Sequence, residues 1–192
     1  MTDREPLKST LKFIEDYTYG HPITIEQNPL YTVLQTEYRE KYGWSIIDKQ
    51  SLELIKNHII GKKTLEINCG KGFWTYCLRL LGCDILATDL FTQYSSWVTV
   101  EQLDAVSAVE KYNGERSVLL CSWPDIGKEY AYEAISRFTG DTIIYIGENK
   151  DGCCATDSFF DYLTQNYQKL EIKNTLQHWP FLNDCLSIYK KK

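Results

Sequence analysis

Hydrophobic positions along this chain follow two different patterns, and the change between them falls near residue 61. Before it, apolar residues recur every three to four positions, which predicts amphipathic helices at about 1–20, 28–42 and 48–60. After it, short apolar runs of the kind that form buried strands occur at 64–68, 84–88, 97–100, 117–121 and 142–146. Helical stretches follow most of these runs and end at about 81, 112, 138 and 167.

Strands that alternate with helices predict an α/β protein with a mostly parallel sheet and helices on both faces. Two further strands, at about 169–176 and 185–189, come last with no helix between them, so we expect a final hairpin. No linker or repeat interrupts the pattern. We therefore expect one domain over 1–192, with an N-terminal helical cap at 1–61 and a core at 62–192. The cap would either cover the substrate side or support the sheet edge.

Composition is that of an ordinary globular protein, with 43% apolar and 24% charged residues. Because no run of 18 apolar residues and no basic-then-apolar leader occur, we expect neither a membrane span nor secretion. The seven cysteines are odd in number and scattered, which favours reduced thiols in the cytoplasm over disulfides or a metal site. A net charge of −5 makes a nucleic-acid partner unlikely.

The stretch from Thr64 to Asp89 carries the strongest chemical signal. An apolar strand runs into a glycine turn, a helix follows, and a second strand ends on Asp89 roughly 20 residues beyond the turn, as in nucleotide-binding βαβ units. Gly70 and Gly72 let the backbone approach a ligand and leave N–H groups free at a positive helix N-terminus. Asp89 can accept hydrogen bonds from both ribose hydroxyls. The unit predicts an adenosine-containing cofactor.

Glu66 is unusual because it stands inside the apolar first strand. A buried carboxylate needs a partner, so we expect it to face the turn and to bond the loop or a cationic group of the ligand. A nicotinamide dinucleotide would require a third glycine, but Gly72 is followed by Phe73, Trp74 and Thr75, so that pattern fails.

The run from Glu66 to Gly72 instead resembles the E-x-G-x-G-x-G signature of class I S-adenosylmethionine (SAM) methyltransferases, with Asn68 in place of the first glycine. Asparagine tolerates left-handed backbone geometry better than most residues, so we expect the turn to survive. The resemblance implies a Rossmann-like sheet with an antiparallel final strand inserted in it, and SAM as methyl donor. It implies cofactor contacts from Glu66, Asn68, Cys69, Gly70, Gly72, Asp89, Leu90, Asp104 and Ala105.

Asp104-Ala105 stands about where these enzymes place an acidic residue near the adenine amine. A helix N-cap explains Asp104 equally well. From about Tyr42 to Tyr189 the chain is also similar to a poorly characterised group of small methyltransferase-like proteins from bacteria, fungi and large viruses. The matching pieces are Tyr42–Ile46, Glu66–Trp74, Leu120-Cys121, Trp123-Pro124, Ala131–Ala134, Tyr145–Glu148 and Gly152-Cys153.

Aromatic loop residues are the candidates for the substrate site. Tyr42 and Trp44 flank a glycine, and an aromatic face suits a sulfonium cation, although Trp44 could equally fill the core. Trp123 follows the central strand at the switch point of the sheet, where ligands of such folds bind. The related group tends to have Trp-Pro-Pro-Tyr there, whereas this chain continues with Pro124 and Asp125.

Three polar residues near the same sheet edge are candidate proton acceptors, namely Asp125, Glu148 and His178. A lone loop histidine is more often merely solvated. With Trp123 and Pro124 they complete the candidate catalytic set. The first hypothesis is therefore in-line transfer of a methyl group from SAM to an oxygen or nitrogen of a small molecule or a protein side chain. The alternative is a catalytically inactive SAM-binding or scaffold protein that acts through a partner, and the sequence predicts no oligomeric state.

Overall fold

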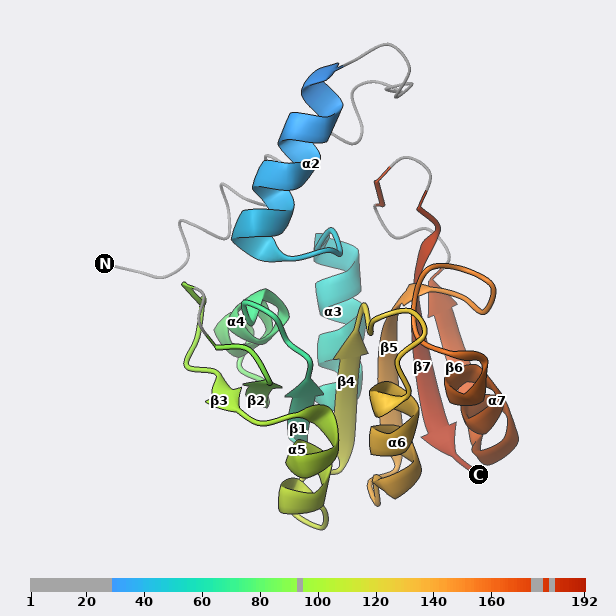
Figure 1. Ribbon diagram of the computed structural model, residues 1–192. Helices are drawn as coiled ribbons and strands as arrows, with labels where there is room; N and C mark the ends of the chain where they lie inside the picture. Colours follow the sequence, from blue (N-terminus) through green and yellow to red (C-terminus); the bar gives the residue numbers. More distant parts are fainter. Residues whose placement is uncertain (1–28, 93–94, 174–177, 180–181) are drawn as a thin grey trace.

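The computed structural model describes residues 29–92, 95–173, 178–179 and 182–192, so the helix expected near 1–20 lies outside the described residues. A seven-stranded sheet has the order β3-β2-β1-β4-β5-β7-β6 (Figure 1). Its pairings are parallel except those of β7, which runs antiparallel to both β5 and β6. The predicted α/β class is confirmed, together with an antiparallel final strand inserted in the sheet.

The strands are β1 (Lys63–Ile67), β2 (Asp84–Asp89), β3 (Glu101–Gln102), β4 (Val118–Ser122), β5 (Thr142–Glu148), β6 (Tyr167–Lys173) and β7 (Asp184–Lys191). The helices are α2 (Pro29–Tyr42), α3 (Lys49–Ile59), α4 (Phe73–Leu80), α5 (Ala105–Tyr112), α6 (Tyr130–Arg137) and α7 (Asp157–Asn166). Most expected bounds agree with these within a few residues. In the described part of the chain, every helix is too short or too polar to cross a bilayer.

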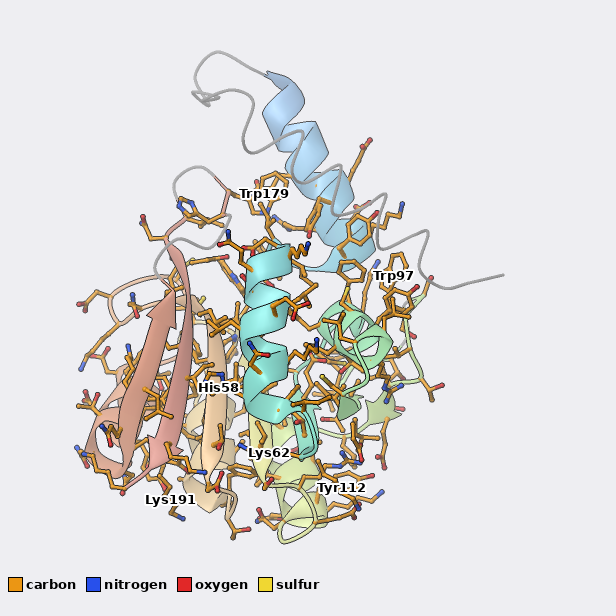
Figure 2. The ribbon with its side chains drawn as sticks, turned by 180° about the vertical axis from the view of Figure 1, so that it is seen from behind. His58, Lys62, Trp97, Tyr112, Trp179 and Lys191 are labelled. Carbon is orange, nitrogen blue, oxygen red and sulfur yellow. The ribbon has the colours of Figure 1, made fainter. Side chains whose placement is uncertain are left out.

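Helices cover both faces of the sheet, as predicted. On one face α3 and α4 share a hydrophobic cluster with strand residues such as Leu120 and Ile144. On the other face α5, α6 and α7 pack around Leu119, Tyr145 and Phe159. Figure 2 views the molecule from behind and shows α3 over this face of the sheet. Strand β5 and all of β4 except Ser122 are buried between these layers, which explains why their sequences are mainly continuous apolar runs.

The first two described helices have different positions. Ile55 and Ile59 of α3 are completely buried in the cluster that includes β4 and β5, so α3 is a layer of the core. By contrast, α2 lies beyond the carboxyl ends of the parallel strands (Figure 1), with Tyr38 buried beside Ile46. Division of the chain at residue 61 stays a prediction. Of the two described helices before that residue, α2 is the one that lies where a cap over the carboxyl ends of the strands would lie.

The third strand was misplaced by the sequence pattern. We expected it at 97–100, whereas the structure has a two-residue strand at Glu101–Gln102. Trp97 instead packs its ring against Tyr42 and Phe73, and its backbone N–H donates to the oxygen of Lys71 at 2.8 Å. The apolar residues of this segment thus cover the glycine turn and do not join the sheet.

Candidate cofactor and acceptor site

The turn between β1 and α4 contains three left-handed residues, with φ of 44° at Asn68, 56° at Gly70 and 70° at Gly72. Asn68 therefore adopts the geometry that was expected of it. Its Nδ2 donates to the backbone oxygen of Ser122 at 2.9 Å, and the Cys121 thiol donates to its Oδ1 at 3.4 Å. A glycine could form neither bond, so Asn68 fastens the turn to the end of β4.

Gly70 and Gly72 have different surroundings. A Cβ built on Gly70 would meet nothing within 4 Å, so this part of the turn faces open space. A Cβ on Gly72 would lie 2.6 Å from Cγ2 of Val98, in the segment that covers the turn. Gly70 is thus on the side from which a ligand can approach, while Gly72 permits close packing within the chain.

Replacing Gly72 by alanine is expected to lower the free energy of unfolding by about 2–5 kcal/mol. Left-handed geometry costs a residue with a Cβ about 1–2 kcal/mol, and overpacking against Val98 adds about 1–3 kcal/mol. Gly70→Ala is the matched control, because it incurs only the first cost. Urea unfolding measures both, and equal losses in the two variants would contradict the packing of Val98 on the turn.

Asp89 is held against the turn. Its Oδ2 accepts the N–H of Gly70 at 2.8 Å and its Oδ1 accepts the N–H of Phe91 at 2.9 Å. Each carboxylate oxygen has a further lone pair, so the group can still accept hydrogen bonds from a ribose. Leu90, which follows directly, is 50% exposed and could cover an apolar ring. The fold thus brings together the acid and the turn that the sequence predicted to share a ligand.

Glu66 is only 1% exposed, and its partner is the first turn of α4. Its Oε2 accepts the backbone N–H of Thr75 at 3.1 Å and the Thr75 hydroxyl, whereas its Oε1 is buried without a hydrogen-bond partner. The expected partner was the loop or the ligand, whereas the observed partner is Thr75 in helix α4. Burial raises the pKa of Glu66 to about 7, against the lowering effect of Thr75.

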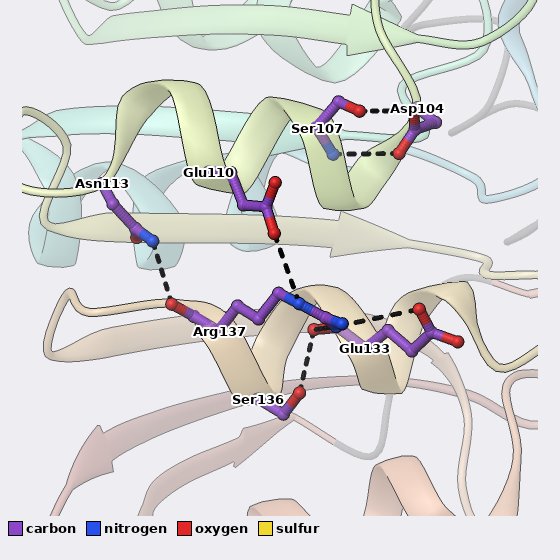
Figure 3. A network of polar contacts seen from close by, with 7 residues as sticks. All are labelled: Asp104, Ser107, Glu110, Asn113, Glu133, Ser136 and Arg137. Carbon is purple, nitrogen blue, oxygen red and sulfur yellow. Dashed lines mark hydrogen bonds and ion pairs between the residues drawn. The ribbon is translucent and has the colours of Figure 1, made fainter.

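Three further predicted cofactor residues have structural roles. Cys69 donates its backbone N–H to Thr88 at 3.1 Å, which fixes the turn against β2. Asp104 caps α5 by accepting the N–H of Ser107 at 2.9 Å and its hydroxyl at 2.6 Å (Figure 3). These bonds lower the pKa of Asp104. The N-cap interpretation of Asp104 is confirmed, its contact with an adenine stays a prediction, and Ala105 is buried beside it.

The two aromatic residues of the predicted substrate site are in different environments. Trp44 is 45% exposed, which excludes the alternative that it fills the core. Its ring stacks on Trp123, with centroids 5.3 Å apart and planes inclined by 14°, and the Arg39 guanidinium lies 3.7 Å from its centroid. Tyr42 instead packs into the cluster around Trp97 and Phe73, so it supports α2.

Trp123 has a left-handed backbone, with φ of 50°, directly after β4. Such strain in a bulky residue costs about 1–3 kcal/mol and is frequent at functional sites. Its N–H donates to Ile146 at 2.8 Å and its indole N–H donates to Oδ2 of Asp184 at 3.0 Å. Sequence reasoning missed Asp184, although an acid next to the apolar run of the last strand was a signal of the same kind as Glu66.

Glu148 is the best-anchored of the predicted proton acceptors. Its Oε2 accepts the N–H of Cys153 and its Oε1 the N–H of Asn183, both at 2.8 Å. Burial by itself would raise the pKa of Glu148, but these bonds outweigh it and the pKa is lowered. A carboxylate so engaged is a weak base, and the geometry favours a role in fixing the two loops.

The remaining candidates are more peripheral. Asp125 is exposed, and its backbone N–H donates to the Tyr130 hydroxyl at 2.8 Å. Pro124 is buried and its oxygen accepts the N–H of Ala155 at 2.9 Å. His178 is exposed, yet close enough to Glu148 and Asp184 to lower the pKa of both carboxyls. Their roles in catalysis stay predictions.

A cleft of about 450 Å³ opens beside the turn. It is lined by Glu37, Glu40 and Lys41 of α2, by Lys71 of the turn, and by Ser95, Ser96 and Trp97. None of these was predicted to hold the cofactor, and Asp89 and Gly70 are not among them. We therefore do not identify this cleft with the nucleotide site.

The cysteines form no disulfide, and all seven are free thiols. The vicinal pair is split between environments, since Cys153 is exposed and Cys154 is buried. Among the residues that the structure describes, no group of three or more His, Cys, Asp or Glu side chains is placed to hold a metal ion.

No protein-family model and no curated protein matches the sequence. Solved structures resemble the fold over its whole length. Magnesium protoporphyrin IX methyltransferase from Synechocystis PCC 6803, with bound SAM, has a TM-score of 0.54 at 11% identity and covers 100% of this chain and 98% of its own. The 1,6-didemethyltoxoflavin-N1-methyltransferase from Burkholderia thailandensis gives 0.50 at 13%, covering 100% and 92%.

The glycopeptide N-methyltransferase MtfA, complexed with S-adenosylhomocysteine, has a TM-score of 0.54 at 11% identity and covers 90% of this chain and 100% of its own. Identities this low establish the fold alone. The strand order, the inserted antiparallel strand and these neighbours agree. The chain has the fold of the class I SAM-dependent methyltransferases.

Proposed function

We propose that the protein is a SAM-dependent methyltransferase. The observation that carries this proposal is the pairing of Asp89 with the N–H of Gly70, on the open side of a left-handed glycine turn. This arrangement places the Asp89 carboxylate, which has unused lone pairs, beside an open backbone turn at one sheet edge, and this suits a ribose. The methyltransferases that share the fold support SAM as the ligand.

The residues present fit this cofactor. Asp89 would hold the ribose, Leu90 the adenine ring, and the turn around Gly70 the methionine part. Oε1 of Glu66, buried without a partner, would accept a hydrogen bond from the ligand's amino group or from a water beside it. When bound, SAM supplies an activated methyl group. The chain mainly has to align the acceptor for in-line displacement, which in ideal cases contributes about 7–11 kcal/mol.

The acceptor is proposed to be an oxygen or a nitrogen of a small molecule or a protein side chain. Trp44 and Trp123 lie at the carboxyl end of β4, where ligands of open α/β sheets bind. Two of the compared enzymes are N-methyltransferases by name, which fits nitrogen.

Binding of S-adenosylhomocysteine is the direct test. At about 100 times its dissociation constant a ligand stabilises the folded state by roughly 2.7 kcal/mol, and each kcal/mol raises the melting temperature of a domain of this size by roughly 2–4 °C. We therefore expect a rise of about 5–10 °C in a thermal unfolding assay. Adenosine serves as the control, with a smaller shift because it lacks the methionine part. No rise at millimolar ligand would contradict the proposed function.

One observation favours the alternative of an inactive or scaffold protein. The indole rings of Trp44 and Trp123 lie on one another, and Arg39 covers the outer ring, so side chains of the chain itself occupy this region. A protein that binds S-adenosylhomocysteine but transfers no label from methyl-labelled SAM in a cell extract would have this second function.

A further inference from the structure

Two carboxylate oxygens in the described part of the chain are buried without a hydrogen-bond partner, Oε1 of Glu66 and Oδ1 of Asp184. Glu66 belongs to the proposed cofactor side, on β1. Asp184 pairs with Glu148 across the β5–β7 ladder, and β7 is three strands away from β1 in the sheet. A buried acceptor without a donor is costly. Asp184 therefore points to a donor that the described residues do not provide.

The other oxygen of Asp184 is tied to the aromatic stack. Oδ2 accepts the indole N–H of Trp123 at 3.0 Å, and the ring of Trp123 lies on Trp44. Arg39 lies over the ring of Trp44, which shows that this stack already accommodates a cation. The side chain of Trp123 thus contacts both an aromatic ring, that of Trp44, and a buried carboxylate, that of Asp184.

The charges around Asp184 make the region negative. The titratable groups that interact with it are Glu148 on β5, His178 and the thiols of Cys153, Cys154 and Cys185. Asp184 itself is only 1% exposed. Burial raises the pKa of Asp184 to about 6, and the charge of Glu148 adds to this rise. The hydrogen bond from Trp123 acts in the opposite direction and lowers the pKa. Near pH 8 both carboxyls are ionised. Such a site favours a group that carries N–H donors and positive charge, and it repels an anion.

We propose that the methyl acceptor is an amine and that Asp184 accepts its N–H through Oδ1. This inference rests on the proposed function and narrows its acceptor from oxygen or nitrogen to nitrogen. It also replaces Asp125, Glu148 and His178 by Asp184 as the proton acceptor, because Asp184 has a free oxygen beside the aromatic stack.

The proton and electron balance is simple. The amine enters as an ammonium ion and gives one proton to Oδ1 of Asp184. The nitrogen lone pair then forms a bond to the methyl carbon of SAM, and the carbon–sulfur bond breaks with its electron pair left on sulfur. The products are a methylated ammonium ion and S-adenosylhomocysteine, and Asp184 releases its proton to water.

The test measures binding of three probes of one shape, benzylamine, benzyl alcohol and benzoate, to the protein saturated with S-adenosylhomocysteine. Quenching of tryptophan fluorescence at pH 8 gives the dissociation constants. We expect benzylamine to bind at least about tenfold more tightly than benzyl alcohol, since hydrogen bonds to charged groups are worth more than neutral ones. Benzoate should bind most weakly.

Asp184→Asn should reduce the preference for benzylamine to within about twofold, because the amide lacks the charge. The amide oxygen can still accept the Trp123 indole N–H, so folding is preserved. Asp84→Asn, which changes an exposed acid at the amino end of β2, is the matched control and should keep the preference.

Several results would overturn the inference: alcohol binding as tightly as amine, a preference that survives Asp184→Asn, or no quenching by any probe at millimolar concentration. Binding of S-adenosylhomocysteine separates this failure from that of the proposed function. If the wild-type protein does not bind it, the proposed function fails. If both wild type and Asp184→Asn bind it but no amine preference exists, only the assignment of the acceptor fails.

Discussion

Asp89→Ala is expected to weaken the binding of S-adenosylhomocysteine at least about 100-fold. Two ribose hydroxyls would donate to the Asp89 carboxylate, and a hydrogen bond to a charged group is worth about 1.5–3 kcal/mol, so that losing two of them costs at least about 100-fold in affinity. The substitution also removes the bonds that Asp89 accepts from Gly70 and Phe91. Isothermal titration calorimetry measures the change in affinity directly.

Asp84→Ala is the matched control for this prediction. Asp84 begins the strand that Asp89 ends, and its exposed side chain contacts Arg116 at 3.2 Å. Removing it should leave the affinity within about twofold, since surface ion pairs contribute about 0–1 kcal/mol to stability and this one is far from the turn. Affinity of Asp89→Ala within threefold of the wild type would contradict the ribose contact. Urea unfolding of both variants shows whether a loss of affinity reflects a loss of folding.

Glu66→Gln should remove a large pH dependence of stability. The pKa of Glu66 is raised from 4.5 to about 7 by burial, so the folded state binds this proton more tightly than the unfolded state. The free energy of unfolding therefore falls as the pH rises from about 4.5 to about 7, and stays low above that. A pKa rise of this size corresponds to a fall of about 3 kcal/mol in the free energy of unfolding over this pH range. Glutamine has no proton to lose, so the variant should lack this slope.

The measurement is urea unfolding of both proteins between pH 4.5 and 8.5. The stability of Glu66→Gln relative to the wild type should increase by about 3 kcal/mol over this range. Asp184, whose pKa is also raised, contributes a similar fall between its ordinary value of 3.8 and about 6. It does so in both proteins, so its contribution cancels in the difference. A difference that is independent of pH would mean that Glu66 ionises normally in the folded protein.

Local patterns determined most of the fold. The three-to-four spacing of apolar residues predicted α3, and continuous apolar runs predicted β4 and β5, because each of these elements buries its own side chains against the sheet. The left-handed turn was predictable for a different local reason. Asn68 and Gly70 follow directly from β1, and their left-handed geometry is a property of the residue itself.

Long-range contacts decided what local patterns could not. The apolar run at 97–100 suits a strand, but the ring of Trp97 stacks on Tyr42, 55 residues earlier in the sequence. The strand β3 therefore begins only at Glu101. Asp184 contacts Trp123 across 61 residues, and Trp44 reaches the same ring from the end of α2. No sequence period encodes such pairs, since they depend on which strands become neighbours.

The sequence by itself determined the α/β class, the final hairpin and the glycine turn with its acid, because these depend on neighbouring residues and on fixed spacings. The insertion of the last strand into the sheet was implied by the family resemblance. Only the tertiary structure decided which carboxylates keep a free oxygen. Both carboxylate oxygens of Glu148 accept backbone N–H groups, whereas Glu66 and Asp184 each have one oxygen without a hydrogen-bond partner. That difference arises from the packing of distant loops around each group, and it decides where the chain can still bind a ligand.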